Sequence, residues 1–340
     1  MKPSALRSSL AHLVRKQRPP FLWGAPGVGK SDLVAQVAKD LDMELRDVRM
    51  SLLDPTDLKG FPVPDIEKSV MRWLAADFLP PMAVKKGAKT LPNPSKGILF
   101  LDEMNSAAPA VQATGYQLIL NRRVGEYTLP AGWSVIAAGN RTGDRSIVHT
   151  QPAALANRFV HLDFDVNVED WMHWAMDHNI HTDLRAFIAF RPALLHVFDP
   201  KENPRAYPTP RSWAFVNDIY QSGLSQDQEY ELIKGTVGEG VGIEFTAFVR
   251  LIKDLPTVDE VLLNPDTAPV PSSPGAKFAI SAALDTKTTK TNIGRAMAYI
   301  GRMPIEYQVM YIRNASRRDR SLVETKTFMD WAVKNEAVMK

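Results

Sequence analysis

A glycine-rich segment followed by Lys-Ser separates a short apolar run from an amphipathic one. Its eight residues fit the spacing G-x-x-x-x-G-K-[ST] and are Gly24, Ala25, Pro26, Gly27, Val28, Gly29, Lys30 and Ser31. Glycines let successive backbone N–H groups turn inward around phosphates, and Lys30 would add positive charge at the β- and γ-phosphates. The Ser31 hydroxyl would ligate Mg²⁺, and the following helix would point its positive end at the anion. The segment, with Asp32, predicts a nucleotide site.

Two adjacent carboxylates follow a second apolar run. Residues 98–101 are all apolar and predict a central strand that ends at Asp102 and Glu103. Ligands bind at the carboxyl ends of strands in open α/β sheets. There Asp102 would hold the Mg²⁺ shell, and Glu103 would orient and deprotonate an attacking water. Alone, the pair would fit the first turn of a helix equally well, but the phosphate loop favours the catalytic interpretation.

Three more polar residues lie where predicted elements begin or end. Asn140 ends a predicted strand, where its amide could hydrogen-bond the attacking water or the γ-phosphate, although asparagine is also common in turns. Arg158 precedes another predicted strand, and Arg211 lies just inside a predicted helix. A lone arginine is normally a surface residue, but the transition state of phosphoryl transfer needs added positive charge.

The hydrophobic pattern changes along the chain and suggests three domains. Residues 1–166 alternate short apolar runs with helical patterns, which predicts an α/β fold with a parallel sheet covered on both sides. Residues 167–264 show helical patterns only. Residues 265–340 start with four prolines between Pro265 and Pro274, which indicates a linker or an extended strap, and continue with about three helices. A capping-box spacing predicts that the last helix begins at Ser321.

Composition excludes several protein classes. The 340 residues are 45% hydrophobic and 23% charged, as in ordinary globular proteins, and there is no cysteine to form a disulfide or a thiolate metal site. No apolar stretch approaches the ~20 residues that a membrane span needs, and the start lacks the apolar core of a secretory signal, so we expect a cytoplasmic protein. The net charge of +3 includes 12 Lys and Arg against 7 Asp and Glu in residues 266–340, a weak indication of nucleic-acid binding.

The order of these features resembles the AAA+ ATPases, and more narrowly the MoxR branch with the related CbbQ proteins, a dynein-related AAA_5 type. The closer signs are the segments LDPTDLKGFPVPD, ILFLDEMNSAAPAVQATGYQLILNRRVGEYTLPAGWSVIAAGNR, ALANRF and PTPRSW. The resemblance covers roughly residues 21–224. It implies a P-loop NTPase core, then an all-helical lid and a helical C-terminal extension, with ATP and Mg²⁺ as ligands.

The resemblance also implies roles for individual residues. Asn140 would be the first sensor, and Arg158 would be the arginine finger that reaches the nucleotide of a neighbouring subunit. Arg211 would be the second sensor, on the lid. Arg145 is a competing finger candidate, although the segment NRF places Arg158 where the family pattern expects it. Family members form hexameric rings and often act on a partner with a von Willebrand factor A domain.

Two insertions could contact that partner. Residues 52–73 are rich in glycine and proline, which favours turns over a long helix, and residues 121–133 have the pattern of a β-hairpin. Trp73, Arg122 and Arg123 could grip a client, or Trp73 could fill a local core while the arginines solvate a helix end.

Three functions fit these features. The first is an ATP-hydrolysing ring that remodels or activates a protein. The alternative is an AAA+ motor of a restriction or replication system, which the basic C-terminal residues suggest, although a basic stripe with interleaved aromatics is missing. The third is a small-molecule kinase, which would need neither Glu103 as a base nor a neighbour's arginine.

Overall fold

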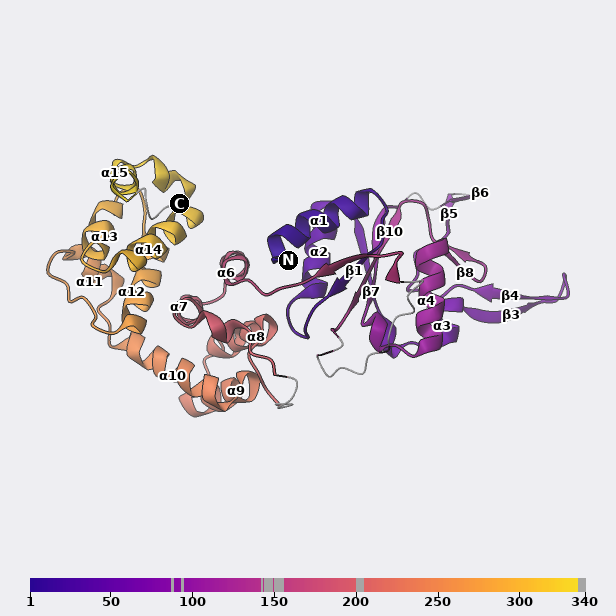
Figure 1. The fold of residues 1–340 in the computed structure, drawn as a ribbon, viewed down its shortest axis with the longest axis horizontal. Coiled ribbons are helices and arrows are strands. Elements are labelled where there is room, and N and C mark those ends of the chain that lie inside the picture. Colours follow the sequence, from indigo (N-terminus) through magenta and orange to yellow (C-terminus); the bar gives the residue numbers. More distant parts are fainter. Residues whose placement is uncertain are drawn as a thin grey trace. The chain divides into compact units, whose positions relative to one another are not determined.

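The computed structural model of the chain describes residues 1–86, 89–92, 95–141, 143, 149, 156–199 and 205–335. The chain divides into two compact units (Figure 1). The nucleotide unit spans Met1–Asn167, and the helical unit spans Val168–Phe198 and Pro204–Lys340. The further division into a lid and an extension at residue 264 stays a prediction.

A parallel sheet forms the centre of the nucleotide unit. Its five described strands lie in the order β11 (Val160–Asp163), β1 (Pro20–Trp23), β10 (Trp133–Gly139), β7 (Gly97–Asp102) and β2 (Glu44–Arg49). Every residue of β7 and β10 is buried, as continuous apolar runs in a two-sided sheet require. The predicted α/β fold with a parallel sheet is confirmed.

Helices cover both faces of this sheet (Figure 1). On one face lie α1 (Pro3–Arg15) and α2 (Lys30–Asp40), and α4 (Pro109–Asn121) lies on the other (Figure 1). Side chains alternate along β7, and Leu99 and Leu101 join the core cluster that includes α4. Burial of side chains of this size stabilises the fold by about 1.5–3 kcal/mol each.

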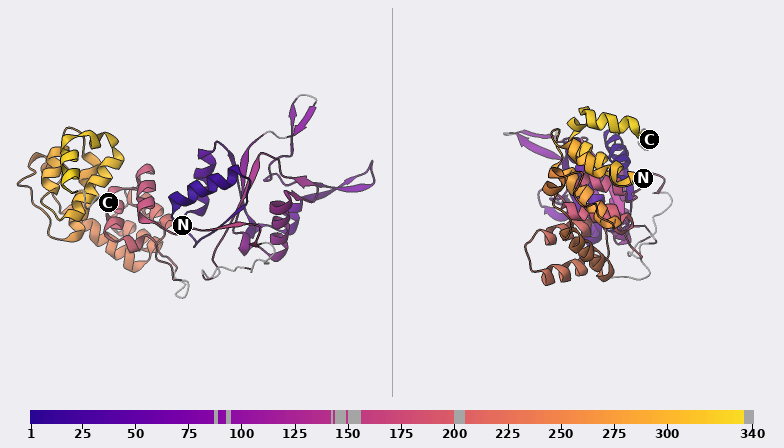
Figure 2. Two further views of the ribbon diagram at one scale, coloured as in Figure 1. Left: turned by 45° about the horizontal axis from the view of Figure 1, so that its top comes forward. Right: turned by 90° about the vertical axis from the view of Figure 1, so that its left-hand side faces the viewer.

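The insertion after β2 contains short elements instead of a long helix. It runs through η1 (Met50–Leu52), α3 (Pro55–Lys59) and the antiparallel hairpin of β3 (Phe61–Asp65) and β4 (Val70–Leu74). A further hairpin joins β5 (Ala83–Lys86) and β6 (Lys89–Pro92). Both hairpins extend away from the sheet in Figures 1 and 2. The prediction of turns in this insertion is confirmed.

The second insertion is the predicted β-hairpin, and the structure assigns its two arginines different surroundings. Strands β8 (Arg123–Val124) and β9 (Tyr127–Thr128) pair antiparallel. Arg122 does not extend outward: its Nη2 donates to the carbonyls of Pro130 and Trp133, each at 2.8 Å. Partial burial lowers the pKa of its guanidinium. Arg122 therefore supports the hairpin, and only Arg123 is exposed as a candidate for partner contact.

We expect the Arg122→Ala substitution to lower the free energy of unfolding by about 1–3 kcal/mol, because two carbonyls lose a charged donor. Arg123→Ala is the matched control. Among the residues described, Arg123 donates to the nearby Gly125 carbonyl alone, and its removal should change stability by less than about 0.5 kcal/mol. Urea unfolding of the two variants measures the difference. Equal free energies of unfolding for the two variants would show that the hydrogen bonds of Arg122 do not stabilise the fold.

The helical unit has no β-strand among its described residues (Figure 2). Its elements are α6 (Val168–Asp177), α7 (Thr182–Phe190), η3 (Pro192–Leu195), α8 (Pro210–Tyr220), α9 (Gln226–Val237), α10 (Glu239–Lys253), α11 (Val258–Leu263), α12 (Pro274–Lys287), α13 (Ile293–Ile300), α14 (Ile305–Arg318), η4 (Arg320–Glu324) and α15 (Lys326–Lys334). Within the described part of the chain, no helix is both long enough and apolar enough to cross a bilayer.

The C-terminal region differs from the sequence prediction at one helix start. The last helix begins at Lys326, not at Ser321, because Thr325 is its N-cap and accepts a hydrogen bond from the Phe328 N–H. Residues 320–324 form η4 instead. The proline-rich segment is a strap packed within the unit, where Arg302 donates to the carbonyls of Pro265 and Ala268 at 2.8 Å.

Candidate nucleotide site

The glycine-rich loop lies at the carboxyl end of β1 and leads directly into α2. Its Gly24 N–H donates to the Gly139 carbonyl at the end of β10, at 3.3 Å. Gly27 and Gly29 have φ values of 77° and 99°, a left-handed conformation that favours glycine. Gly29 is the N-cap of α2, so the amino end of the helix follows the loop directly. This geometry suits an anion.

Lys30 is the one cation that the predicted site residues enclose. It is buried, and its Nζ lies 2.7 Å from the Gly24 carbonyl and 3.1 Å from both the Ala25 carbonyl and Asn140 Oδ1. The ammonium therefore connects the loop after β1 to the end of β10. Phosphate oxygens would outcompete these neutral acceptors, because hydrogen bonds between charged groups are about twice as strong.

Ser31 and Asp102 form the pair that fits a divalent cation. The Ser31 hydroxyl donates to Asp102 Oδ2 at 3.0 Å, beside the phosphate loop. Hydroxyl and carboxylate oxygens are the hard ligands that Mg²⁺ prefers. Asp47 on β2 adds a third carboxyl group near Asp102 and Glu103. Partial burial and these two carboxylates raise the pKa of Asp47, because negative charge is concentrated here. The residues present therefore fit Mg²⁺.

Glu103 lies just beyond β7 in a left-handed conformation, with φ 54°. Its N–H donates to Asp102 Oδ1 at 2.8 Å, which fixes the turn between the two carboxylates. Its Oε2 accepts a hydrogen bond from the hydroxyl of Ser51 in η1. The contact with Ser51 was not predicted from the sequence, because the two residues lie 52 positions apart.

A second residue that the sequence analysis missed is Asn105, which holds Asn140 in place. Asn105 is buried; its Nδ2 donates to the Asn140 carbonyl at 2.7 Å, and its Oδ1 accepts from the Asn140 N–H at 3.2 Å. Gly139 makes this approach possible, because a Cβ there would lie 2.2 Å from Asn105 Oδ1. An asparagine two residues after Glu103 was the available sequence signal.

No described hydrogen bond or ion pair joins the remaining candidates to this cluster. Arg158 is exposed in the turn before β11 and forms no hydrogen bond or ion pair with the residues described. Arg211 is exposed in the first turn of α8, in the helical unit. Asp32 is exposed on α2, where its Oδ2 accepts from Gln36 Nε2 at 2.8 Å. Arg145 lies outside the described residues.

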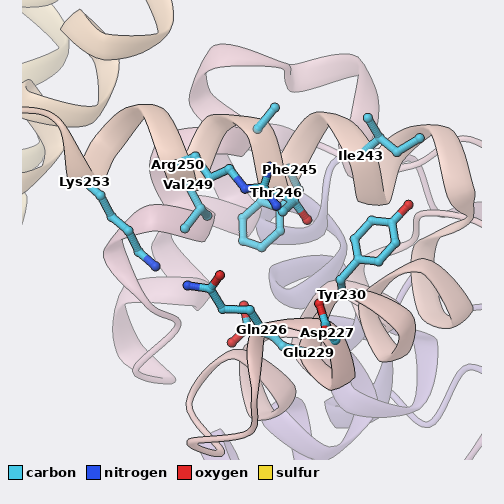
Figure 3. Close-up of a pocket in the computed structure, with 11 residues that line it drawn as sticks. Gln226, Asp227, Glu229, Tyr230, Ile243, Phe245, Thr246, Val249, Arg250 and Lys253 are labelled. Atoms are coloured by element: carbon cyan, nitrogen blue, oxygen red, sulfur yellow. The ribbon is translucent and has the colours of Figure 1, made fainter.

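A separate hollow of about 490 Å³ lies in the helical unit between α9 and α10 (Figure 3). Tyr230, Ile243 and Phe245 supply apolar surface, and Arg250 and Lys253 lie opposite Asp227 and Glu229. Burial raises the pKa of Glu229 while Lys253 opposes the shift. None of the predicted nucleotide residues lines this hollow, and its mixed charges do not resemble a phosphate site.

Comparison with known protein families finds a match in the nucleotide unit. Residues 20–164 match the family described as "ATPase family associated with various cellular activities (AAA)". Midasin from Giardia intestinalis is 29% identical over 196 residues, which are 55% of this chain but only 4% of that protein. The chain thus spans a small fraction of the length of this curated relative.

Solved structures that align with the chain are distant. A Cytophaga hutchinsonii protein described provisionally as an ATPase is 16% identical, with 91% of this chain and 79% of that chain aligned at a TM-score of 0.35. The Thermotoga maritima RuvB Holliday junction branch migration motor is also 16% identical, with 83% and 80% aligned at a TM-score of 0.38.

Proposed function

We propose that the protein, whose residues 20–164 match the AAA ATPase family, is a ring-forming motor that hydrolyses Mg-ATP to remodel or activate a protein partner. We place it in the MoxR branch, on the motifs that resemble that branch. Steady-state phosphate release from ATP without an acceptor tests the hydrolase. A kinase built on the same loop would release little phosphate under these conditions.

One observation carries the proposal: hydrogen bonds within the nucleotide unit connect the phosphate loop and the carboxyl ends of β7 and β10, whereas Asp32 and the arginines stay outside this network. Lys30 donates to Asn140 at 3.1 Å, the neighbouring Ser31 donates to Asp102 at 3.0 Å, and Glu103 directly follows Asp102. Arg158 is exposed and is engaged by no described residue. An exposed arginine that no described residue engages is available to an adjoining subunit, and a shared catalytic centre in a ring requires such a residue.

The proposed reaction is attack of water on the γ-phosphate. Glu103 accepts a proton from the water as its oxygen bonds to phosphorus and the bond to the β-phosphate oxygen breaks, giving ADP and phosphate. Lys30 balances charge on the β- and γ-phosphates, and Asn140 orients the water. Arg158 of the adjoining subunit stabilises charge that develops in the transition state. Arg211, in the helical unit, would be the second sensor of the γ-phosphate.

Ser31 and Asp102 would hold Mg²⁺, directly or through water. When bound, the ion would supply positive charge that offsets the charge of the phosphates. The protein supplies the positions of the two oxygens through their 3.0 Å hydrogen bond and through the buried end of β7.

We expect Asp102→Asn to raise the Mg²⁺ concentration needed for half-maximal ATP hydrolysis by about 10–100-fold, because an amide oxygen replaces an anionic one at the metal. Asp40→Asn, at the opposite end of α2, is the matched control and should leave the Mg²⁺ dependence unchanged. Initial rates across a Mg²⁺ titration make the comparison. The same Mg²⁺ requirement in both variants would remove Asp102 from the metal site.

The β3–β4 hairpin supports the proposal of a protein partner. Phe61, Ile66 and Trp73 on this hairpin are 71%, 86% and 36% exposed. Clusters of exposed apolar side chains on a protruding element are typical of protein interaction sites. We propose that this hairpin contacts the client, for which a protein with a von Willebrand factor A domain is our candidate.

The alternative of a nucleic-acid motor rests on the basic C-terminal residues. Two of these arginines contact other groups of the helical unit: Arg313 forms an ion pair with Glu169 at 2.9 Å, and Arg318 donates to the Asp285 and Thr288 carbonyls. These contacts compete with binding to DNA phosphates. We therefore expect duplex or single-stranded DNA to leave the ATPase rate unchanged within about twofold. Stimulation by DNA that weakens with added salt would favour the alternative.

A further inference from the structure

Both ring nitrogens of His161, on the edge strand β11, are hydrogen-bonded. Trp23 Nε1 lies 2.9 Å from His161 Nδ1, and His161 Nε2 lies 2.7 Å from the Ala156 carbonyl oxygen. An indole N–H can only donate, so Nδ1 must be the acceptor. The neutral ring therefore carries its proton on Nε2 and donates it to the Ala156 carbonyl.

Aromatic packing holds the orientation of this ring. His161 stacks on Trp23 with ring centroids 6.0 Å apart and an interplanar angle of 23°. The rings of Phe21 and Phe159 lie 6.0 and 6.1 Å away. The side chain of His161 is exposed, but these ring contacts and its two hydrogen bonds fix the orientation of the imidazole.

The two partners of His161 belong to segments with different tasks. Trp23 is the last residue of β1 and directly precedes Gly24, where the phosphate loop begins. The Ala156 carbonyl closes a turn by accepting the Phe159 N–H at 3.2 Å, and Arg158 lies inside that turn. His161 thus connects the base of the phosphate loop to the turn that presents Arg158.

We propose that His161 is a positioning residue for Arg158: its Nε2–H holds the turn 156–159 against the end of β1, so that the guanidinium is presented at a fixed position to the adjoining subunit. The inference rests on the proposed function of Arg158 as a finger. The hydrogen bonds from Trp23 to His161 and from His161 to the Ala156 carbonyl start beside Gly24. Within one subunit they therefore connect the phosphate loop to Arg158, which that subunit supplies to its neighbour.

A mixture of two inactive subunits tests this proposal. An Arg158→Ala subunit keeps Glu103 but supplies no finger, whereas a Glu103→Gln subunit supplies Arg158 but cannot activate water at its own site. When the two are mixed, the only complete centres combine Arg158 of the Glu103→Gln subunit with Glu103 of the Arg158→Ala subunit. A change of His161 in the Glu103→Gln subunit then reports solely on the supply of Arg158.

We expect His161→Asn in the Glu103→Gln subunit to lower the ATPase rate of the mixture about 10-fold, because asparagine is too short to reach the Ala156 carbonyl. His161→Gln can place an amide N–H near the position of Nε2 and should keep the rate within about threefold. The same His161→Asn change in the Arg158→Ala subunit is the matched control and should have little effect, since that subunit supplies no finger.

Three results would overturn the proposal. One is an unchanged rate with His161→Asn in the finger-supplying subunit. Another is an equal loss when the change is placed in either subunit, which would indicate general destabilisation. The third is the absence of any activity in the mixture with intact His161; this result would refute the finger assignment of Arg158 itself and is recognised before any His161 variant is introduced.

Discussion

Arg158→Ala should lower the turnover of ATP by about 10³-fold or more while ATP binding changes by less than about threefold. Arginine fingers contribute 10³–10⁵ to the rate of phosphoryl transfer because they act on charge that develops in the transition state. No described hydrogen bond joins Arg158 to Lys30, Ser31 or Asn140, so its removal should leave the groups that would hold ATP in its own subunit in place. The combination of intact binding and lost turnover is therefore the expected signature.

Phosphate release under saturating ATP measures turnover, and equilibrium binding of a fluorescent ATP analogue measures affinity. Arg123→Ala is a suitable control, because Arg123 is also exposed but lies on the β8–β9 hairpin. Full turnover by Arg158→Ala would mean that another cation performs this role, and Arg145 would be the next candidate.

Glu103→Gln should reduce hydrolysis about 10²–10⁴-fold and leave the protein loaded with ATP. A carboxamide cannot accept the proton of the attacking water, so general-base catalysis is lost. The side chain keeps its length and an oxygen that can still accept the Ser51 hydrogen bond, so the fold around β7 should persist. Rapid-quench assays and the nucleotide content of the purified protein measure the two effects.

This variant also identifies the client, because a motor that stays loaded with ATP holds its partner longer. Affinity capture with Glu103→Gln, compared with Lys30→Ala, should enrich a protein that the second variant does not retain. Wild-type hydrolysis by Glu103→Gln would contradict the assignment of the base, even if the capture experiment yielded a partner.

The sheet could be predicted because its strands are short continuous apolar runs separated by strong local signals. Residues 98–101 can hardly be anything except a buried strand, and the glycine loop marks both the end of β1 and the start of α2. Each of these patterns is local. The order of the strands is not local: Lys30 meets Asn140 because β1 and β10 are neighbours in the sheet, which the structure shows and the patterns alone do not specify.

The features that were missed depend on contacts between distant segments. Ser51 meets Glu103 because β2 and β7 are neighbouring parallel strands that end with Arg49 opposite Asp102, and no local spacing encodes that pairing. Arg122 was interpreted as a surface residue, yet the hairpin brings the carbonyls of Pro130 and Trp133 within its reach. At residue 325, a threonine cap outcompetes the capping pattern that starts at Ser321.

The measurement that tests the central claim most directly is the ATPase rate per subunit as a function of protein concentration, with the mass of the assembly determined by sedimentation in the same samples. If each catalytic centre combines Glu103 of one subunit with Arg158 of the next, the rate per subunit must rise as subunits associate and must approach zero for monomers. An undiminished rate in samples that contain only monomers would contradict the shared centre.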